Sequence, residues 1–229
     1  MSEENATSHY VGEAGRKYHE GKRGIPTTAI PWVAALRAEK LAHCVKATDT
    51  VLEYGVGAGW NLAHLVCAKR MGFDVSKFLE PEVHKLGIDF VASTQGILAS
   101  SIDVVICHHT LEHVPNPAEV LQEIKRVLQK NGTLLLFVPF EKERRYRHYN
   151  PAEPNHHLYS WNVQTLGNLV ADKGFQIAEA HVAPFGYDRF AAKWATRFCL
   201  GEKGFRLLRS ALHLIKPASE VRLVARKVD

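Results

Sequence analysis

The sequence lacks the features that mark a secreted, disulfide-bonded or membrane-spanning protein. Its four cysteines, Cys44, Cys67, Cys107 and Cys199, lie far apart in apolar surroundings and include no C-x-x-C pair, which indicates buried free thiols. No apolar run approaches the roughly 18 residues that a transmembrane helix requires. The acidic, polar first residues are not followed by the apolar core of a signal peptide. We therefore expect a cytoplasmic protein without a transmembrane segment.

A strong charge of either sign is also missing. The 29 Lys and Arg residues against 24 Asp and Glu residues give a net charge of +5, which is too weak by itself to predict a nucleic-acid partner. The excess is unevenly placed. Residues 185–229 carry ten basic and four acidic side chains, a net charge of +6. Residues 1–184 carry 19 basic and 20 acidic side chains, a net charge of −1. Because the body of the chain is neutral, we expect no nucleic-acid partner.

The order of predicted strands and helices indicates one α/β domain that spans residues 1–229. The length and the 46% hydrophobic composition are typical of a globular chain, and no linker or repeat divides it. Residues 1–30 are polar and glycine-rich, which predicts an N-terminal arm or lid. Strands are predicted at 50–54, 71–74, 88–92, 103–108, 133–138, 175–182 and 220–225, with helices near 31–45, 61–68, 81–85, 116–128 and 162–173. This alternation predicts a mostly parallel sheet.

A glycine-rich turn follows the first predicted strand. Gly55, Gly57 and Gly59 allow the backbone to turn sharply and to approach a ligand at a helix N-terminus. Asp74 ends the next strand, where a carboxylate can accept hydrogen bonds from both hydroxyls of a ribose. The combination of glycines and acid predicts a nucleoside ligand.

Two residues near this turn bear on which nucleoside binds. A dinucleotide site favours Gly-x-Gly-x-x-Gly, but the chain has Trp60 where the last glycine is expected. Glu53, at the end of the strand, is unfavourable near phosphates and suits a ligand that carries positive charge. An NAD(P)-dependent oxidoreductase of Rossmann architecture therefore stays an alternative that these residues disfavour.

Four blocks of sequence follow one another along about residues 45–182. They are VLEYGVGAGWNLAHL, GFDVS, SIDVVICHHTLEHVPNPAEVLQEIKRVLQKNGTLLLFVP and HHLYSWNVQTLGNLVADKGF. In this order they resemble the motifs of the class I S-adenosylmethionine (SAM)-dependent methyltransferases, in the branch with an LEHVPNP-type block after the fourth strand. The resemblance implies SAM as the cofactor. It also implies a Rossmann-like, doubly wound seven-stranded sheet of order 3-2-1-4-5-7-6, with strand 7 antiparallel.

The resemblance assigns cofactor contacts to individual residues. Glu53 would approach the methionyl end of SAM, and Asp74 would bind the ribose hydroxyls. The residues that would line the cofactor are Gly55, Gly57 and Gly59, with His108 near the methionyl group.

The adenine end departs from the family pattern. Members often carry an acid just after the third strand, which binds the adenine amino group. Here the corresponding stretch reads Ser93-Thr94-Gln95, so Thr94 or Gln95 is the candidate adenine contact through a side-chain oxygen.

Histidines gather after the fourth and fifth predicted strands, at the edge of the sheet where ligands bind. His109 and His148 are the candidate general bases for a hydroxyl acceptor, because a histidine can take up a proton near neutral pH. Further candidate acceptor contacts are Tyr18, Arg147, His156, His157 and Tyr159. The alternative for the loop residues is a solvated surface. These histidines are assigned to proton transfer and to acceptor contacts, and no metal site is predicted.

A basic segment, residues 184–217, interrupts the pattern between the sixth and seventh predicted strands. Phe190, Trp194 and Phe198 recur every four residues, which predicts one face of a helix, with basic residues at the same spacing beside them. A second apolar stripe consists of Phe205, Leu208, Leu212 and Ile215. These faces would cover the sheet, the acceptor pocket or a partner in a homodimer. The alternative is peripheral contact with an anionic membrane or a lipid-linked substrate.

The sequence thus predicts a SAM-dependent methyltransferase that acts on a small-molecule acceptor. Oxygen is the favoured methylated atom, and sugar- or lipid-linked acceptors fit the polar loop and the basic segment. The alternatives are the NAD(P)-dependent oxidoreductase and a catalytically silent protein that binds SAM.

Overall fold

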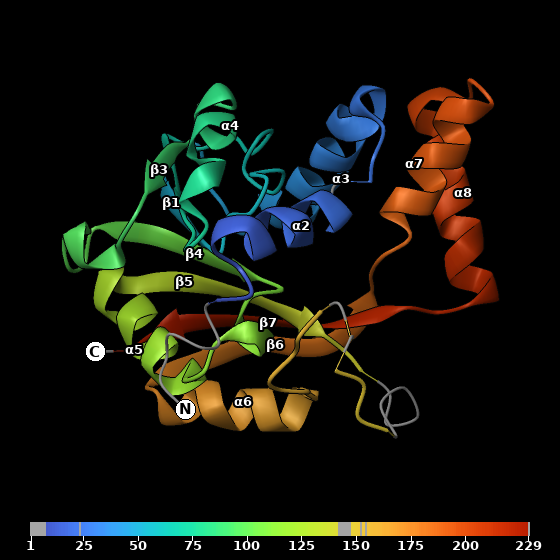
Figure 1. Ribbon diagram of the computed structural model, residues 1–229. Helices are drawn as coiled ribbons and strands as arrows, with labels where there is room; N and C mark the ends of the chain where they lie inside the picture. The colour runs from blue at the N-terminus through green and yellow to red at the C-terminus, as the bar shows by residue number, and fades with distance from the viewer. Residues whose placement is uncertain (1–7, 23, 142–147, 152, 154, 229) are drawn as a thin grey trace.

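A seven-stranded sheet forms the centre of the computed structural model, which describes residues 8–22, 24–141, 148–151, 153 and 155–228 (Figure 1). The strand order is β3-β2-β1-β4-β5-β7-β6. The strands are β1 Thr50–Tyr54, β2 Lys69–Phe73, β3 Asp89–Val91, β4 Ile102–His108, β5 Leu128–Pro139, β6 Phe175–Pro184 and β7 Ser219–Lys227. Strand β7 pairs antiparallel with both β5 and β6, while the other pairs are parallel. The predicted fold, strand order and antiparallel strand 7 are confirmed.

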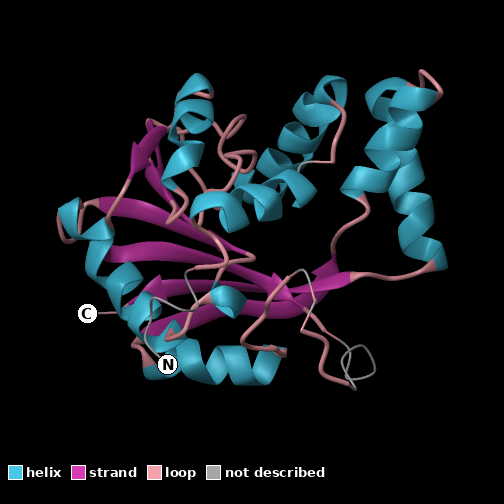
Figure 2. Ribbon diagram, in the orientation of Figure 1, coloured by secondary structure: helices cyan, strands magenta, loops and turns pink. Residues whose placement is uncertain are grey.

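Helices cover both faces of this sheet (Figure 2). Helices α3 (Ile30–Ala42) and α4 (Glu80–Lys85) pack on one face, and α5 (Pro117–Val127) and α6 (Val163–Asp172) pack on the other. Side chains alternate along each central strand. In β1, Val51 belongs to the core under α3 and α4, whereas Leu52 belongs to the core over α5 and α6. Two-sided burial explains why these strands are almost wholly apolar.

Local sequence signals position the helices that follow β4 and precede β6. The Asn116 side chain accepts a hydrogen bond from the Glu119 amide, and Pro117 occupies the first turn of α5, where its missing N–H costs nothing. Asn162 and Thr165 form a reciprocal capping box at the start of α6.

The helix predicted near residues 61–68 is not present. Residues 61–64 form turns and residues 65–68 are irregular, and the Ala63 amide donates to the Gly59 carbonyl at the spacing of an α-helix. The Arg70 guanidinium, which follows on β2, donates to the carbonyls of Leu62 and Ala63. Carbonyls that a helix would satisfy internally are thus bound by a side chain from a neighbouring strand.

The described part of the N-terminal arm contains a helix, α2 (Gly12–Lys22), and a short 3-10 turn, Thr27–Ala29. The polar, glycine-rich composition did not predict this helix. Tyr10, just before it, is buried at 9% exposure, and the Tyr10 hydroxyl lies 2.8 Å from His113 Nδ1 beyond β4. The arm therefore reaches the carboxyl edge of the sheet.

Helices α7 (Asp188–Arg197) and α8 (Gly201–Ile215) form a pair between β6 and β7 that stands beside α3 (Figure 1). The buried face of α7 consists of Ala191, Ala192 and Ala195, which pack with Phe205 of α8. The aromatic face, predicted to cover the sheet, the acceptor pocket or a homodimer partner, does not pack on the sheet and is exposed in the single chain, although Phe190 lines the main cavity. Its residues are Phe190, Trp194 and Phe198, at 54%, 59% and 57% exposure. Within the described residues, no helix combines the length and apolar character needed to cross a membrane.

Candidate active site

The glycine turn after β1 is held open by backbone geometry and by one acid. Gly55 and Gly57 have φ angles of +83° and +51°, in the left-handed region that favours glycine. A Cβ atom at Gly55 would lie 2.1 Å from Thr110 Oγ1, so no larger residue fits there. No described atom lies within 4 Å of the Cβ position at Gly57, and this glycine lines the main cavity. A ligand can therefore approach the backbone closely at Gly57.

Asp74 fixes this turn from the end of β2. The Asp74 carboxylate accepts hydrogen bonds from the amides of Gly57 and Ser76, both at 2.9 Å. A carboxylate offers about four acceptor positions, so two stay available for a ligand. The position of Asp74 on the cavity wall, with 8% of its surface exposed, is compatible with the predicted ribose contact.

Glu53 lies at the end of β1, buried in the wall of the same cavity. The Asn61 amide donates to Glu53 Oε1, whereas Oε2 has no hydrogen-bond partner among the described residues. Burial is the main cause that raises the pKa of Glu53 to about 8, and the Asn61 hydrogen bond and the Arg37 charge oppose it. A carboxylate with an unused oxygen fits the positively charged ligand predicted from the sequence.

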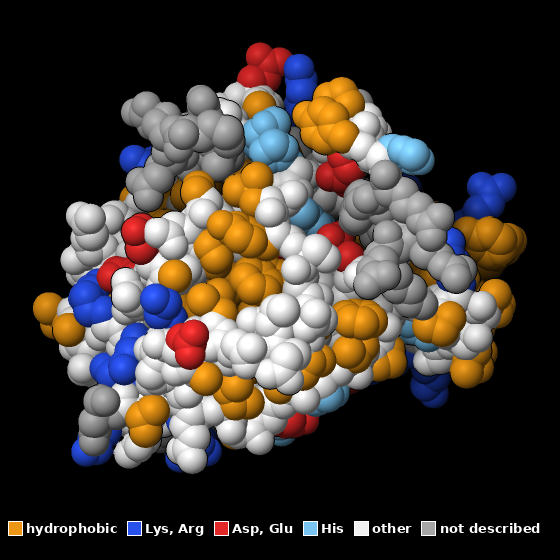
Figure 3. Space-filling model, turned by 90° about the horizontal axis from the view of Figure 1, so that it is seen from below, with side chains coloured by type: hydrophobic (Ala, Val, Ile, Leu, Met, Phe, Trp, Pro, Cys, Tyr) orange, Lys and Arg blue, Asp and Glu red, His pale blue; other side chains and the backbone are white. Residues whose placement is uncertain are grey.

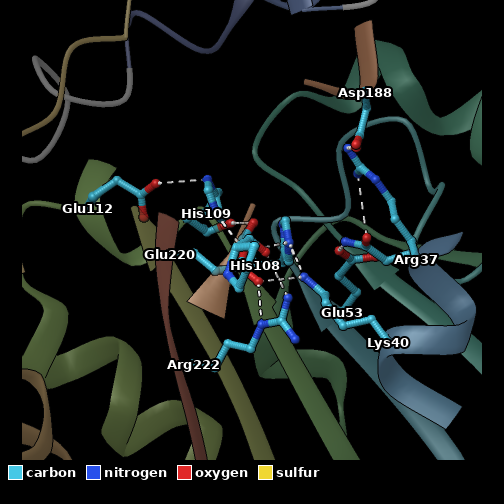
Figure 4. A network of polar contacts seen from close by, with 12 residues as sticks. Arg37, Lys40, Glu53, His108, His109, Glu112, Asp188, Glu220 and Arg222 are labelled. Atoms are coloured by element: carbon cyan, nitrogen blue, oxygen red, sulfur yellow. Dashed lines mark hydrogen bonds and ion pairs between the residues drawn. The ribbon is translucent and has the colours of Figure 1, made fainter. Parts of the chain in front are cut away.

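A second polar cluster connects β4, β7 and α3 (Figure 4). Fully buried Glu220 on β7 lies 3.1 Å from Lys40 Nζ, 2.8 Å from Arg222 Nε and 3.2 Å from His109 Nε2. His108 Nε2 is 2.9 Å from Lys40 Nζ, and the rings of His108 and His109 stack at 4.5 Å. We refer to these five residues as the Glu220 network.

Burial and neighbouring charges shift the pKa values of Glu220, Lys40, His108 and His109. Burial alone would raise the pKa of Glu220, but the hydrogen bond from His109 and the charges of Lys40 and Arg222 hold it at about 2. Burial lowers the pKa of Lys40 to about 8 despite the attraction of Glu220. Burial is also the main reason that the pKa values of His108 and His109 are lowered, and the pKa of His108 lies well below its usual range. Both imidazoles are therefore neutral near pH 7.

A third polar cluster lies next to the Glu220 network, after β4. Glu112, 1% exposed, lies with its Oε1 atom 3.8 Å from His113 Nε2 and 4.0 Å from His109 Nδ1. His157, from the loop after β5, packs its ring 4.8 Å from that of His113, and His157 Nδ1 lies 2.9 Å from Glu141 Oε1. We call Glu112, His113 and His157 the Glu112 cluster.

One cavity of about 1150 Å³ connects the glycine turn with both clusters. Of the predicted site residues, the cavity is lined by Tyr18, Glu53, Gly55, Gly57, Asp74, His108, His109 and His157. Cofactor and acceptor contacts that were predicted separately from the sequence thus face a common space.

Six predicted site residues lie outside the walls of this cavity, namely Gly59, Thr94, Gln95, His148, His156 and Tyr159. A Cβ at Gly59 would lie 2.9 Å from Ile88, so this glycine serves packing. Thr94 accepts from Arg126 through its carbonyl, and Tyr159 donates to the carbonyl of Pro115. Their contacts with cofactor or acceptor stay predictions.

The other three outside residues lie at the surface or against the arm. Gln95 and His148 are exposed, and His156 stacks on His9 at 3.7 Å. Arg147 lies outside the residues that the structure describes.

Several residues that face the cavity or its charged wall were not predicted from the sequence. Lys40 and Glu220 are separated by 180 positions, and no local motif connects them. Glu112 and His113 stand in the LEHV block, which was the one available signal. Tyr10 was seen as part of a polar arm, although its hydroxyl contacts His113.

Comparisons with known proteins agree with this geometry. Residues 28–180, more than half of the chain, match the family model described as "Methyltransferase domain". A relative from two strains of Mycobacterium tuberculosis, named a probable S-adenosylmethionine-dependent methyltransferase, is 28% identical over 166 residues. That match covers 68% of this chain and 60% of the relative, so the chain spans less than two thirds of the relative's length.

Two solved structures share the fold at low identity. A Thermotoga maritima SAM-dependent methyltransferase, described as a possible histamine N-methyltransferase, has a TM-score of 0.63 at 18% identity and covers 93% of this chain and 97% of its own. A phosphoethanolamine N-methyltransferase from Haemonchus contortus, solved with S-adenosylhomocysteine and phosphomonomethylethanolamine, has a TM-score of 0.57 at 15% identity. That match covers 85% of this chain and 52% of the Haemonchus protein. With the family match over residues 28–180, these findings show that the chain belongs to the methyltransferase-domain family.

Proposed function

We propose that this protein transfers a methyl group from SAM to an oxygen of a small hydroxylated molecule, in the branch of the family with an LEHVPNP-type block. The observation that carries the proposal is one cavity that both groups of residues line. We call the side with the glycine turn, Glu53 and Asp74 the cofactor end, and the side with His109 and the Glu112 cluster the acceptor end. A cofactor and an acceptor bound in one cavity can be held in line, and such positioning supplies much of the rate enhancement in a displacement reaction. We further propose that residues 1–229 act as one domain.

At the cofactor end, the residues present fit SAM. The unused Glu53 oxygen would accept from the ammonium of the methionyl group, and Asp74 would accept from the ribose hydroxyls. The open backbone at Gly57 would let the cofactor lie against the turn. When bound, SAM supplies an electrophilic methyl group on a sulfonium.

At the acceptor end, His109 would act as the general base. His109 Nε2 faces the Glu220 carboxylate at 3.2 Å and donates its proton there, which leaves Nδ1 to take up a proton. The lowered pKa of His109 keeps the ring neutral at pH 7. His109 Nδ1 would take up the proton of the acceptor hydroxyl as that oxygen receives the methyl group. The sulfur of SAM would keep the electron pair of the carbon–sulfur bond that is broken.

The acceptor end favours a neutral, hydroxyl-bearing molecule over an anion. Its walls include the carboxylates of Glu112 and Glu141, together with the hydroxyls of Tyr10 and Tyr18. Phe185, whose ring lies 4.3 Å from that of His109, adds an apolar surface on which a sugar or aromatic ring can stack. A sugar-bearing acceptor matches this mixture.

Cofactor binding is expected to release just under one proton at pH 7. Free Glu53 is mostly protonated there because its pKa is about 8, and the ammonium of S-adenosylhomocysteine would favour the carboxylate. The same raised pKa makes the stability of the free protein depend on pH. Its stabilising contribution to the free protein is full at low pH and is lost as pH rises through 8.

Calorimetry in two buffers of different ionisation enthalpy measures this release. The observed binding enthalpies of the wild type should differ between the buffers, and those of Glu53→Gln should agree. Equal enthalpies for the wild type would contradict the placement of Glu53 at the ammonium.

We also propose that the exposed face of α7 contacts an anionic lipid surface. Phe190, Trp194 and Phe198 are more than half exposed, with Arg189 and Lys193 beside them on the helix. Arg189 and Phe190 also line the cavity, so a lipid-linked acceptor bound there would lie close to the membrane. At the right edge of Figure 3, where Figure 1 places α7 and α8, hydrophobic and basic side chains lie next to one another.

Co-sedimentation with vesicles tests this contact. The wild type should bind vesicles that contain phosphatidylserine at low salt, and Trp194→Ala with Phe198→Ala should bind several-fold less. No binding of the wild type would reject the membrane contact, and a homodimer in solution that buries this face would explain it instead.

Methyl transfer itself is tested with labelled SAM and a panel of sugar, phenol and amine acceptors. Label on the oxygen of a hydroxylated acceptor, and its loss in His109→Phe with cofactor binding retained, is the expected result. Binding of SAM without any transfer across the panel would favour the catalytically silent alternative.

A further inference from the structure

We propose that the Glu112 cluster is a binding site for one divalent transition-metal ion at the acceptor end of the cavity. The proposal rests on the proposed function for what the ion would do there, but the site itself rests on geometry alone. The ligand atoms of Glu112, His113 and His157 all lie within 4.8 Å of one another. All three residues line the cavity, and their side chains are 1%, 11% and 13% exposed.

The ligand set matches a known preference of metal ions. Two imidazoles and one carboxylate bind Zn²⁺, Fe²⁺, Mn²⁺ and Co²⁺ and leave further positions open for a substrate. Ligand atoms about 2.1 Å from one ion lie roughly 3.0–3.5 Å apart. His113 Nε2 and Glu112 Oε1, at 3.8 Å, would need to approach each other by only a few tenths of an ångström.

The neighbours of His113 set the tautomer that an ion requires. The Tyr10 hydroxyl donates its one proton to the carbonyl of Asn155 or His156, each at 3.3 Å. The Tyr10 oxygen, 2.8 Å from His113 Nδ1, then accepts the proton of that nitrogen. His113 Nε2, which lies 3.8 Å from Glu112 Oε1 and 3.5 Å from the Tyr18 hydroxyl, then carries the lone pair that would bind an ion.

His157 shows the same arrangement with a carboxylate. His157 Nδ1 lies 2.9 Å from Glu141 Oε1, and Glu141 is itself only 5% exposed. Histidines that bind metal commonly donate their other N–H to a carboxylate, which orients the ring and makes it a stronger ligand. The pair leaves His157 Nε2 to bind an ion, with Glu141 as a positioning residue.

The other group of three ligating side chains, His108, His109 and Glu220, is less suited to an ion. Lys40 Nζ lies 2.9 Å from His108 Nε2 and 3.1 Å from Glu220 Oε1, and Arg222 also contacts Glu220. Two cations already neutralise that carboxylate and would repel a third.

An ion in the Glu112 cluster would define the acceptor more narrowly. Its open positions would bind two adjacent oxygens, such as vicinal hydroxyls of a sugar or a catechol. His109 Nδ1 lies 4.0 Å from Glu112 Oε1, so a hydroxyl held by the ion would lie beside the proposed base. We infer an acceptor with neighbouring oxygen atoms, one of which receives the methyl group.

Titration of the chelator-treated 229-residue protein with Zn²⁺ by calorimetry, and with Co²⁺ by visible absorption, tests the site. We expect one ion per chain, with Co²⁺ bands typical of nitrogen and oxygen ligands. Glu112→Gln and His157→Asn should each weaken binding at least tenfold, and Glu141→Gln about tenfold. His181→Ala, which removes an exposed histidine 3.1 Å from Glu179, is the matched control and should bind like the wild type.

The readouts separate this proposal from the proposed function. Metal binding is measured without SAM or acceptor, and S-adenosylhomocysteine binding is measured on the same metal-free samples. Because buried Glu112 can be needed for folding, thermal unfolding is recorded for every variant, and His157→Asn supplies the second, less buried test. No stoichiometric binding, binding unchanged in both variants, or loss in His108→Gln alone would overturn the proposed site.

Discussion

Replacing Glu220 with glutamine is expected to lower the free energy of unfolding by about 3–5 kcal/mol at pH 7. Glu220 is fully buried, and its carboxylate lies within 3.2 Å of Lys40, Arg222 and His109. Glutamine keeps the size but leaves Lys40, with 12% of its side chain exposed, without its counter-charge. Removing one partner of a buried ion pair costs more than the pair contributed, because a charge stays desolvated.

Chemical denaturation of the wild type and Glu220→Gln measures this loss, and Glu179→Gln is the matched control. Glu179 lies on the neighbouring strand β6 and pairs with exposed His181 at the surface. The control should change stability by less than about 1 kcal/mol, as is usual for exposed pairs. A Glu220→Gln protein as stable as the control would show that the network is not the charged centre described above.

The pH dependence of the same experiment has a defined sign. The pKa of Glu220 is about 2 in the folded protein, below its ordinary value of 4.5. The stabilising contribution of Glu220 is therefore complete above about pH 4.5 and is lost as pH falls toward 2. The stability difference between the wild type and Glu220→Gln should shrink in that window.

Replacing Asp74 with alanine is expected to weaken binding of S-adenosylhomocysteine at least tenfold and up to about a hundredfold. The loss of a charge-assisted hydrogen bond costs roughly 1.5–3 kcal/mol, and each 1.4 kcal/mol is a factor of about ten. Alanine also removes the acceptor for the Gly57 amide at 2.9 Å, which fixes the turn against which the cofactor would lie.

Asp89→Ala is the control for this experiment. Asp89 also belongs to the β2–β3 region, but its side chain is exposed and pairs with Lys69. The control should bind S-adenosylhomocysteine like the wild type. Unchanged affinity in Asp74→Ala would show that Asp74 is not the ribose contact.

The fold was predictable because its signals are local. The central strand β4 is a short, almost wholly apolar run, and the Asn116-Pro117 start of α5 follows directly from capping chemistry. The false helix at residues 61–68 shows the limit of such reasoning. A contact made by Arg70, from another element, took the carbonyls that a helix needs.

The candidate site was predictable only at its cofactor end. Glu53, Gly55, Gly57 and Asp74 lie within 22 consecutive residues, so their spacing carries information. The acceptor end is assembled from α3, β4, the loop after β5 and β7, which meet only through the strand order of the sheet. Glu220 reaches His109 because β7 inserts antiparallel beside β5, and no feature near Glu220 in the sequence indicates that contact.

Calorimetry of the wild-type protein with S-adenosylhomocysteine and, separately, with NAD tests the central claim most directly. The account predicts that S-adenosylhomocysteine binds one molecule per chain, with release of nearly one proton at pH 7, and that NAD does not bind. Binding of NAD without binding of S-adenosylhomocysteine would contradict it, because the glycine turn, Glu53 and Trp60 would then hold a dinucleotide.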